Sequence, residues 1–169
     1  MTWLPFDLHP EYPPEGIPRE QLVARYGPDH NDWMRQRFAE EGLVYNPPPE
    51  VVPNTMTALR LTELARERAI QRQVHDRLMQ AYWEEARDIG DPAVLRELVV
   101  EAGLDEAEVA DVLAEDAYRD RVLASTAEAH SFGINGIPAF LLDRRLLVLG
   151  AQRRDVFEGA FAQLEQLTD

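Results

Sequence analysis

The 169-residue chain contains no cysteine. Without a thiol it can form no structural disulfide, no thiolate nucleophile and no cysteine-ligated metal site. Lysine is missing too, because all 17 basic residues are arginines, and 31 acidic residues outnumber them. The resulting net charge of −14 repels phosphate backbones and anionic lipids. We therefore expect neither nucleic-acid binding nor membrane binding.

Long apolar runs are also missing, since no stretch approaches the roughly 18 residues that a bilayer-spanning helix needs. The first ten residues have neither the basic region nor the apolar region of a signal peptide. These features favour a cytoplasmic protein. The histidines show no HExxH or other i, i+4 pairing, and His30 and Asp32 are better interpreted as solvated loop residues than as a local metal pair. No glycine-rich phosphate loop or nucleophile-elbow serine is present. We accordingly expect no metal and no cofactor.

One motif stands out in what is present, the ten residues GINGIPAFLL at 133–142. The pair Asn135-Gly136 favours a turn, and the apolar run after Pro138 is typical of a buried strand. Proline lacks a backbone N–H and tolerates a cis amide, so the N–H and C=O of Ile137 remain available for another partner such as a peptide. An ordinary trans bond before a strand is the simpler interpretation of these residues alone.

Hydrophobic residues make up 45% of the chain, as in a globular protein with a substantial core. Apolar periodicity, caps and turn residues predict strands near both ends and helices between them. The expected strands are Thr2–Leu8, a weak one at Leu43–Tyr45, and a hairpin of Ala139–Leu142 and Leu146–Leu149. The expected helices run from Pro18 to Gly27, from Asp29 to Glu41, from Asn54 or Thr55 onward, through Val74 to near Gly90, from Asp91-Pro92 to Gly103, from Asp105, from Asp116 toward Gly133, and from Arg153 to about Leu167.

This order predicts an α/β fold whose core is split by an all-helical insertion. The corresponding segments are 1–52 for the N-terminal part of the core, 53–132 for the helical insertion, and 133–169 for the C-terminal part with the hairpin and last helix.

Six short pieces occur in an order that resembles the DsbA-like thiol:disulfide oxidoreductases of the FrnE-like subgroup. These pieces are WLPFDL at 3–8, PPEG at 13–16, PNT at 53–55, RDIGDP at 87–92, GINGIP at 133–138 and GAQ at 150–152. The resemblance implies a thioredoxin-like core with a helical insertion. It also implies that Ile137-Pro138 forms a cis-proline loop that holds the backbone of an extended peptide or protein thiol substrate.

The chain departs from this family in one large respect. Family members carry a Cys-x-x-Cys pair at the start of their first helix, ahead of the strand that Thr2–Leu8 resembles. The first strand and first helix of the core are therefore expected to be absent, as in a truncated protein, and no residue of this chain is a candidate for thiol catalysis. Loss of a central strand would leave backbone groups unpaired, so we expect either a homo-oligomer or a rearranged Thr2–Leu8.

Three functions remain open, and whether the chain is an enzyme stays open with them. The first is a disulfide oxidoreductase or isomerase acting on protein disulfides, catalytically incomplete as given. The second is a redox-inactive, thioredoxin-like peptide-binding module. The third is a glutathione-dependent isomerase or kappa-class glutathione transferase relative, in which Asn54 would help to bind substrate, although Asn54 is most simply a helix cap.

Overall fold

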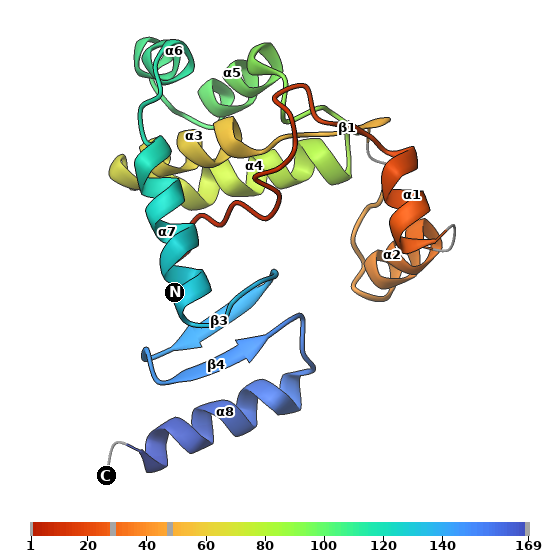
Figure 1. Ribbon diagram of the computed structural model, residues 1–169, viewed down its shortest axis with the longest axis vertical. Coiled ribbons are helices and arrows are strands. Elements are labelled where there is room, and N and C mark those ends of the chain that lie inside the picture. Colours follow the sequence, from red (N-terminus) through yellow and green to blue (C-terminus); the bar gives the residue numbers. More distant parts are fainter. Residues whose placement is uncertain (1, 28–29, 47–48, 168–169) are drawn as a thin grey trace. The chain divides into compact units, whose positions relative to one another are not determined.

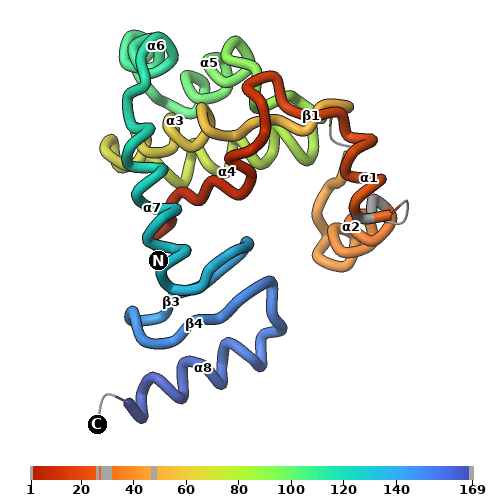
Figure 2. Tube along the Cα trace, in the orientation of Figure 1, coloured from red at the N-terminus to blue at the C-terminus, as the bar shows by residue number. Residues whose placement is uncertain are grey.

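The structure, a computed structural model, describes residues 2–27, 30–46 and 49–167. The chain divides into two compact units, Met1–Ser125 and Thr126–Asp169. Figure 1 and the trace in Figure 2 show the N-terminal segment and most helices in the first unit, and a hairpin with one long helix in the second. The finer three-part division at 52/53 and 132/133 stays a prediction.

A short antiparallel ladder holds the N-terminal part of the first unit together. β1 (Ile17–Pro18) pairs with β2 (Val51–Val52), and α1 (Glu20–Tyr26) and α2 (His30–Glu40) lie between them in the chain. The backbone of Gly16 has a φ of 76°, and a Cβ at this position would collide with the carbonyl oxygen of Val52. Only glycine therefore fits at the start of this ladder.

A block of helices follows and fills the rest of the first unit. Its members are α3 (Met56–Glu67), α4 (Gln71–Trp83), α5 (Pro92–Glu101), α6 (Glu106–Ala114) and α7 (Arg119–Ser131), of which the last crosses into the second unit.

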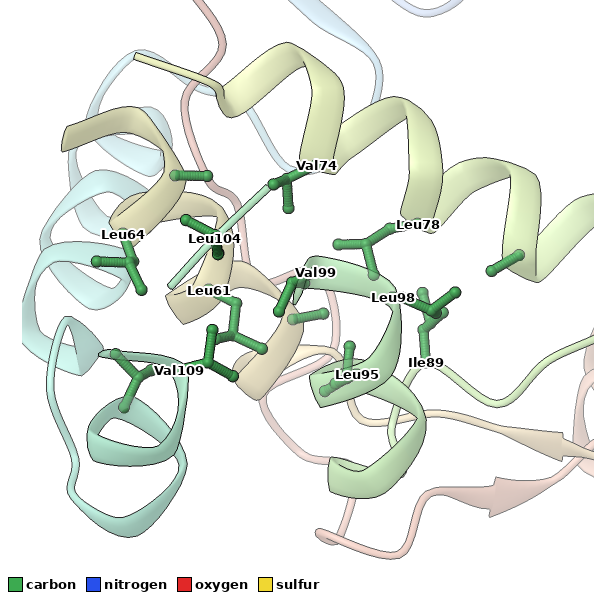
Figure 3. Packing of buried hydrophobic residues seen from close by; sticks show 14 residues of the cluster. Leu61, Leu64, Val74, Leu78, Ile89, Leu95, Leu98, Val99, Leu104 and Val109 are labelled. Atoms are coloured by element: carbon green, nitrogen blue, oxygen red, sulfur yellow. The ribbon is translucent and has the colours of Figure 1, made fainter. Parts of the chain in front are cut away.

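The hydrophobic core sits where α3 to α6 meet (Figure 3). Leu61, Leu95 and Leu98 are completely buried there. Because burial of a leucine side chain contributes roughly 1.5–3 kcal/mol, these contacts supply much of the stability of the block. Other fully buried side chains include Leu64, Val74, Val99 and Val109.

Two aspartates cap helices in this block. The Oδ1 atom of Asp91 accepts hydrogen bonds from Ala93 N at 2.7 Å and Val94 N at 3.4 Å, and Pro92 follows at the first helical position. Asp105 accepts in the same way at the start of α6. The predicted starts of both helices are confirmed, because each cap satisfies backbone N–H groups that have no partner within the helix.

Arg60 connects α3 to the end of α6. Its side chain is only 7% exposed and donates to the carbonyl oxygen of Ala117 at 2.8 Å and to those of Val112 and Glu115. Burial lowers the pKa of Arg60 below its ordinary value, and Asp116 opposes that shift. The guanidinium thus satisfies carbonyl groups where α6 ends, in the position where a positive charge also complements the helix dipole.

The second unit contains the hairpin and the last helix. β3 (Ala139–Leu142) pairs antiparallel with β4 (Leu146–Leu149), and α8 (Arg154–Gln166) follows. The strand bounds are those that the sequence predicts. Asp143 and Arg144 have φ angles of 49° and 54°, and Arg145 N donates to Leu142 O at 3.0 Å. Positive φ at both central residues is the mark of a type I′ turn.

Thr2–Leu8 forms no strand, so that prediction is wrong. Instead the carbonyl oxygen of Trp3 accepts from Gln71 Nε2 at 3.2 Å, and that of Pro5 accepts from Ser125 Oγ at 2.7 Å. The backbone of this segment therefore bonds to side chains of helices rather than to a neighbouring strand.

Two further predictions about local structure need correction. Leu43–Tyr45 is also not a strand. The helix expected to end near Gly90 ends at Trp83, where Asn46 N donates to the carbonyl oxygen of Trp83 at 2.8 Å and the Asn46 side chain donates to that of Glu84. In a longer helix the carbonyl oxygens of Trp83 and Glu84 would instead accept from backbone N–H groups further along the chain. The predicted start of the second helix at Asp29 lies outside the described residues.

Candidate functional site

The loop 133–138 begins with a well-defined helix end. Gly133 N donates to His130 O at 2.9 Å and Ile134 N donates to Ala129 O at 3.0 Å, with Gly133 at a φ of 80°. This pair of hydrogen bonds is a Schellman motif. Ile134 is buried, so the motif fixes the direction in which the loop leaves α7.

Ile137 and Pro138 lie at the other end of the loop, next to β3. The peptide bond between them is cis, the isomer that the resemblance implies. The carbonyl oxygen of Pro138 accepts from Gly150 N at 2.7 Å and so extends the register of the hairpin by one pair. Ile137 is 59% exposed. Neither its N–H nor its C=O has a hydrogen-bond partner among the residues that the structure describes.

The hairpin beside this loop is apolar on both faces. Phe140 packs edge-on against Phe157 of α8, with 4.9 Å between the ring centroids, so this face of β3 lies on the helix. Side chains alternate between faces along a strand, which places Ala139 and Leu141 on the opposite face with their partners Leu149 and Leu147. Leu149 is 48% exposed. The exposed Ile137 is thus followed by an apolar strand face that α8 does not cover.

Arg144 connects the turn of the hairpin to the end of α7 through side-chain contacts. Its guanidinium donates to Glu128 Oε1 at 2.8 Å and lies over the ring of Phe132. This contact could not be predicted from the sequence, in which Arg144 is recognisable only as a turn residue. Three sets of contacts therefore hold the loop: the Schellman motif, the hydrogen bond from Gly150 N to Pro138 O, and the contacts of Arg144.

Asn54, the third predicted site residue, lies in the first unit at the start of α3. Its Nδ2 donates to Tyr12 O at 2.7 Å and its Oδ1 accepts from Met56 N at 3.0 Å. Thr55, the residue before α3, makes no side-chain cap bond. Both polar atoms of Asn54 are thus used to start the helix and to hold the N-terminal loop. Asn54 and Ile137-Pro138 belong to different units, and the role of all three in substrate binding stays a prediction.

The ionisable groups with displaced pKa values that the structure describes belong to the first unit. Burial raises the pKa of Asp7 and lowers that of His75, while hydrogen bonds from Tyr118 and Arg121 lower the pKa of Glu67. Within the described ranges, no group of three or more histidines or carboxylates could hold a metal ion, and no helix is long and apolar enough to cross a bilayer.

The sequence matches the profile of one protein family. The profile of the DSBA-like thioredoxin domain matches residues 1–162. The chain belongs to this family. The predicted fold class, an α/β thioredoxin-like fold with a helical insertion, is thereby confirmed, whereas the FrnE-like subgroup stays a prediction.

The chain is also similar to two individual proteins. The chain is 29% identical over 167 residues to the uncharacterized protein YwbO of Bacillus subtilis, covering 96% of this chain and 80% of YwbO. It is also similar to the crystal structure of a probable DsbA oxidoreductase from Streptomyces coelicolor, with a TM-score of 0.85 and 35% identity. That match covers 94% of this chain and 72% of the other.

Proposed function

We propose that this DsbA-like chain binds extended segments of protein substrates at the loop 133–138, as the substrate-binding part of a thiol:disulfide oxidoreductase or isomerase. One observation carries the proposal. Ile137 is exposed beside an apolar strand face, and its backbone N–H and C=O have no partner among the described residues. An extended peptide can pair with such groups as a strand pairs with a sheet edge.

The chemistry of disulfide exchange limits what these residues can contribute. Exchange proceeds by attack of a thiolate on a disulfide sulfur, and the 169 residues contain no cysteine. In this proposal the thiols come from outside these residues. The chain contributes the surface on which the substrate backbone is aligned.

The proposal is tested by titrating extended peptides into isotope-labelled protein and following amide resonances by NMR. One peptide carries a central cysteine and a second carries serine in its place. We expect both peptides to shift the amides of residues 136–140 equally, because this chain offers no thiol to the cysteine. Shifts confined to other residues, or no shifts at all, would exclude this binding site.

Variants separate backbone pairing from apolar contact. Ile137→Pro removes the N–H, and we expect about fivefold weaker binding, equivalent to one hydrogen bond of about 1 kcal/mol. Ile137→Ala keeps the N–H and should bind more tightly than Ile137→Pro. Phe161→Ala is the matched control, because Phe161 is similarly exposed in the same unit but lies on α8. It should leave binding unchanged.

A redox-inactive peptide-binding module is the second candidate, and the absence of cysteine favours it. The two functions differ in whether the polypeptide that carries these residues in the cell also contains cysteine. Intact-mass analysis of the protein isolated from its source, with thiols blocked by alkylation, distinguishes them. A cysteine-containing polypeptide continuous with these residues supports the oxidoreductase, and a cysteine-free product supports the binding module.

A glutathione-dependent activity is the remaining candidate. It is the weaker one, since both polar atoms of Asn54 already have protein partners. Calorimetric titration with glutathione tests it, and an absence of heat would exclude it. A cytoplasmic location and self-association into a homo-oligomer are part of the same proposal, and cell fractionation and light scattering test them.

A further inference from the structure

Asn135 is followed directly by Gly136 in the loop before Ile137. Both residues lie outside regular secondary structure, and the Asn135 side chain is exposed. Its Nδ2 donates to the carbonyl oxygen of Gly133 at 3.2 Å, a bond within the same loop. We propose that Asn135 is a site of spontaneous deamidation, which converts the loop to an aspartyl or isoaspartyl form as the protein ages.

The reaction needs only this dipeptide and water. The backbone nitrogen of Gly136 gives up its proton to the solvent and attacks Cγ of Asn135, so a C–N bond forms while the bond from Cγ to Nδ2 breaks and ammonia leaves. Water then opens the five-membered imide at either of its two carbonyl carbons. One opening gives aspartate and the other gives isoaspartate, and no atom is oxidised or reduced.

Gly136 has no side chain to obstruct the approach of its nitrogen to Cγ of Asn135. An added Cβ at Gly136 would meet no atom within 4 Å, and the residue does not have a positive φ. This fact makes Gly136→Ala a mild substitution that keeps the fold while adding that obstruction.

The other asparagines differ from Asn135 in ways that oppose the reaction. Asn46 precedes Pro47, which has no N–H to lose. Asn54 precedes the β-branched Thr55, and hydrogen bonds to Tyr12 and Met56 hold its side chain. Asn31 precedes Asp32 in the sequence. Asn54 therefore serves as an internal control in the same molecule.

Deamidation would alter the loop in two ways. It adds a negative charge two residues before Ile137, and the isoaspartyl product also inserts one carbon into the main chain. Any effect of this change on peptide binding rests on the proposed function. The deamidation itself does not, because it is detected by mass alone.

The test incubates the 169-residue protein at physiological temperature in mildly alkaline and mildly acidic buffers, and samples taken over several days are digested with trypsin. The peptide 122–144 contains Asn135 as its only asparagine. We expect this peptide to gain about one mass unit, to split into two chromatographic forms, and to react faster in the alkaline buffer. Asn54 should remain unmodified, and Gly136→Ala should slow the reaction at Asn135 several-fold.

Two results would overturn the inference. One is an unchanged Asn135 in the folded protein over a period in which the synthetic peptide 122–144 is converted, which would show that the fold protects the site. The other is the same rate in Gly136→Ala as in the unsubstituted protein, which would show that the Gly136 nitrogen is not the attacking group. Peptide titrations on the proposed binding loop remain interpretable in either case.

Discussion

The guanidinium of Arg144 donates to Oε1 of Glu128 at 2.8 Å, and its central carbon lies 5.4 Å from the ring centroid of Phe132. Glu128 and Arg144 are sixteen positions apart in the chain, and the loop 133–138 lies between them. A contact that joins the turn of the hairpin to the end of α7 restricts how far the two ends of this loop can separate. We therefore expect Arg144 to restrain the position of the loop.

A double-mutant cycle measures this contact. We expect Arg144→Ala and Glu128→Ala to show a coupling of about 0.5–1 kcal/mol in urea unfolding, since the pair is exposed but the guanidinium also contacts an aromatic ring. The control pair is Arg154 with Glu158, which joins successive turns of α8 at 2.9 Å and should couple by about 0.3 kcal/mol. Equal coupling in the two cycles would count against a special role for Arg144.

Substitution of Arg60 tests the cap on α6. Arg60→Met leaves three carbonyl groups without their donor, and we expect the free energy of unfolding to fall by at least about 3 kcal/mol. Arg60→Lys should recover only part of this loss, because an ammonium group lacks the planar fork that reaches several acceptors. Arg72→Met is the control on an exposed arginine and should change stability by less than about 0.5 kcal/mol. Wild-type stability in Arg60→Lys would refute this interpretation.

The lowered pKa of His75 predicts that the free energy of unfolding of the first unit depends on pH. Its ring lies 4.8 Å from that of Trp3, and burial lowers its pKa below the ordinary value of 6.5. Between the lowered pKa and 6.5 the unfolded chain binds more protons than the folded chain. The free energy of unfolding should therefore fall as pH drops through this window, and none of this loss should occur above it.

His75→Phe keeps an aromatic ring against Trp3 and removes the titrating group. Urea unfolding of both proteins at a series of pH values between about 7 and 5 gives the difference due to His75, since the remaining groups titrate alike in both. We expect the substituted protein to gain stability relative to the wild type as the pH falls. Parallel curves would contradict the assignment.

Asn54→Ala distinguishes a helix cap from a merely exposed side chain. We expect a loss of about 1–2 kcal/mol, because the variant removes the acceptor for Met56 N and the donor to the Tyr12 carbonyl. Thr55→Ala is the matched control, as the Thr55 side chain makes no cap bond, and should cost less than about 0.5 kcal/mol. A Thr55 variant as unstable as the Asn54 variant would contradict the cap.

The elements that could be predicted from the sequence are those specified locally. Two four-residue apolar runs on either side of Asp143 define the hairpin, and aspartates before Pro92 and Glu106 define two helix starts. β1 and β2 could not be predicted, because a two-residue strand that includes Pro18 has too short a pattern to recognise. At Thr2–Leu8 the alternation of side chains is clear, but a strand also needs a neighbouring strand as its partner. The carbonyl oxygens of this segment accept from helix side chains instead.

The candidate site was predictable to the same extent. The motif around Ile137-Pro138 lies within a few residues and could be read directly. Arg60 and Arg144 could not, because each draws its importance from groups far along the chain. An arginine on a helix or in a turn is usually solvated. Arg60 differs from such an arginine by its burial, and the exposed Arg144 differs only by its contacts with Glu128 and Phe132.

Buried side chains are distributed very unevenly along the chain. Among the described residues, the buried apolar side chains after Ser125 are only Ile134, Val148 and Ala160, while the others lie in the first unit. Local opening costs little where few apolar contacts are lost, and mobile binding segments are generally drawn from such regions. The second unit, which contains the loop 133–138, is therefore expected to open locally at a lower free energy than the helical block. A partner could therefore reshape this loop for a small free energy, while the helical block keeps its native packing.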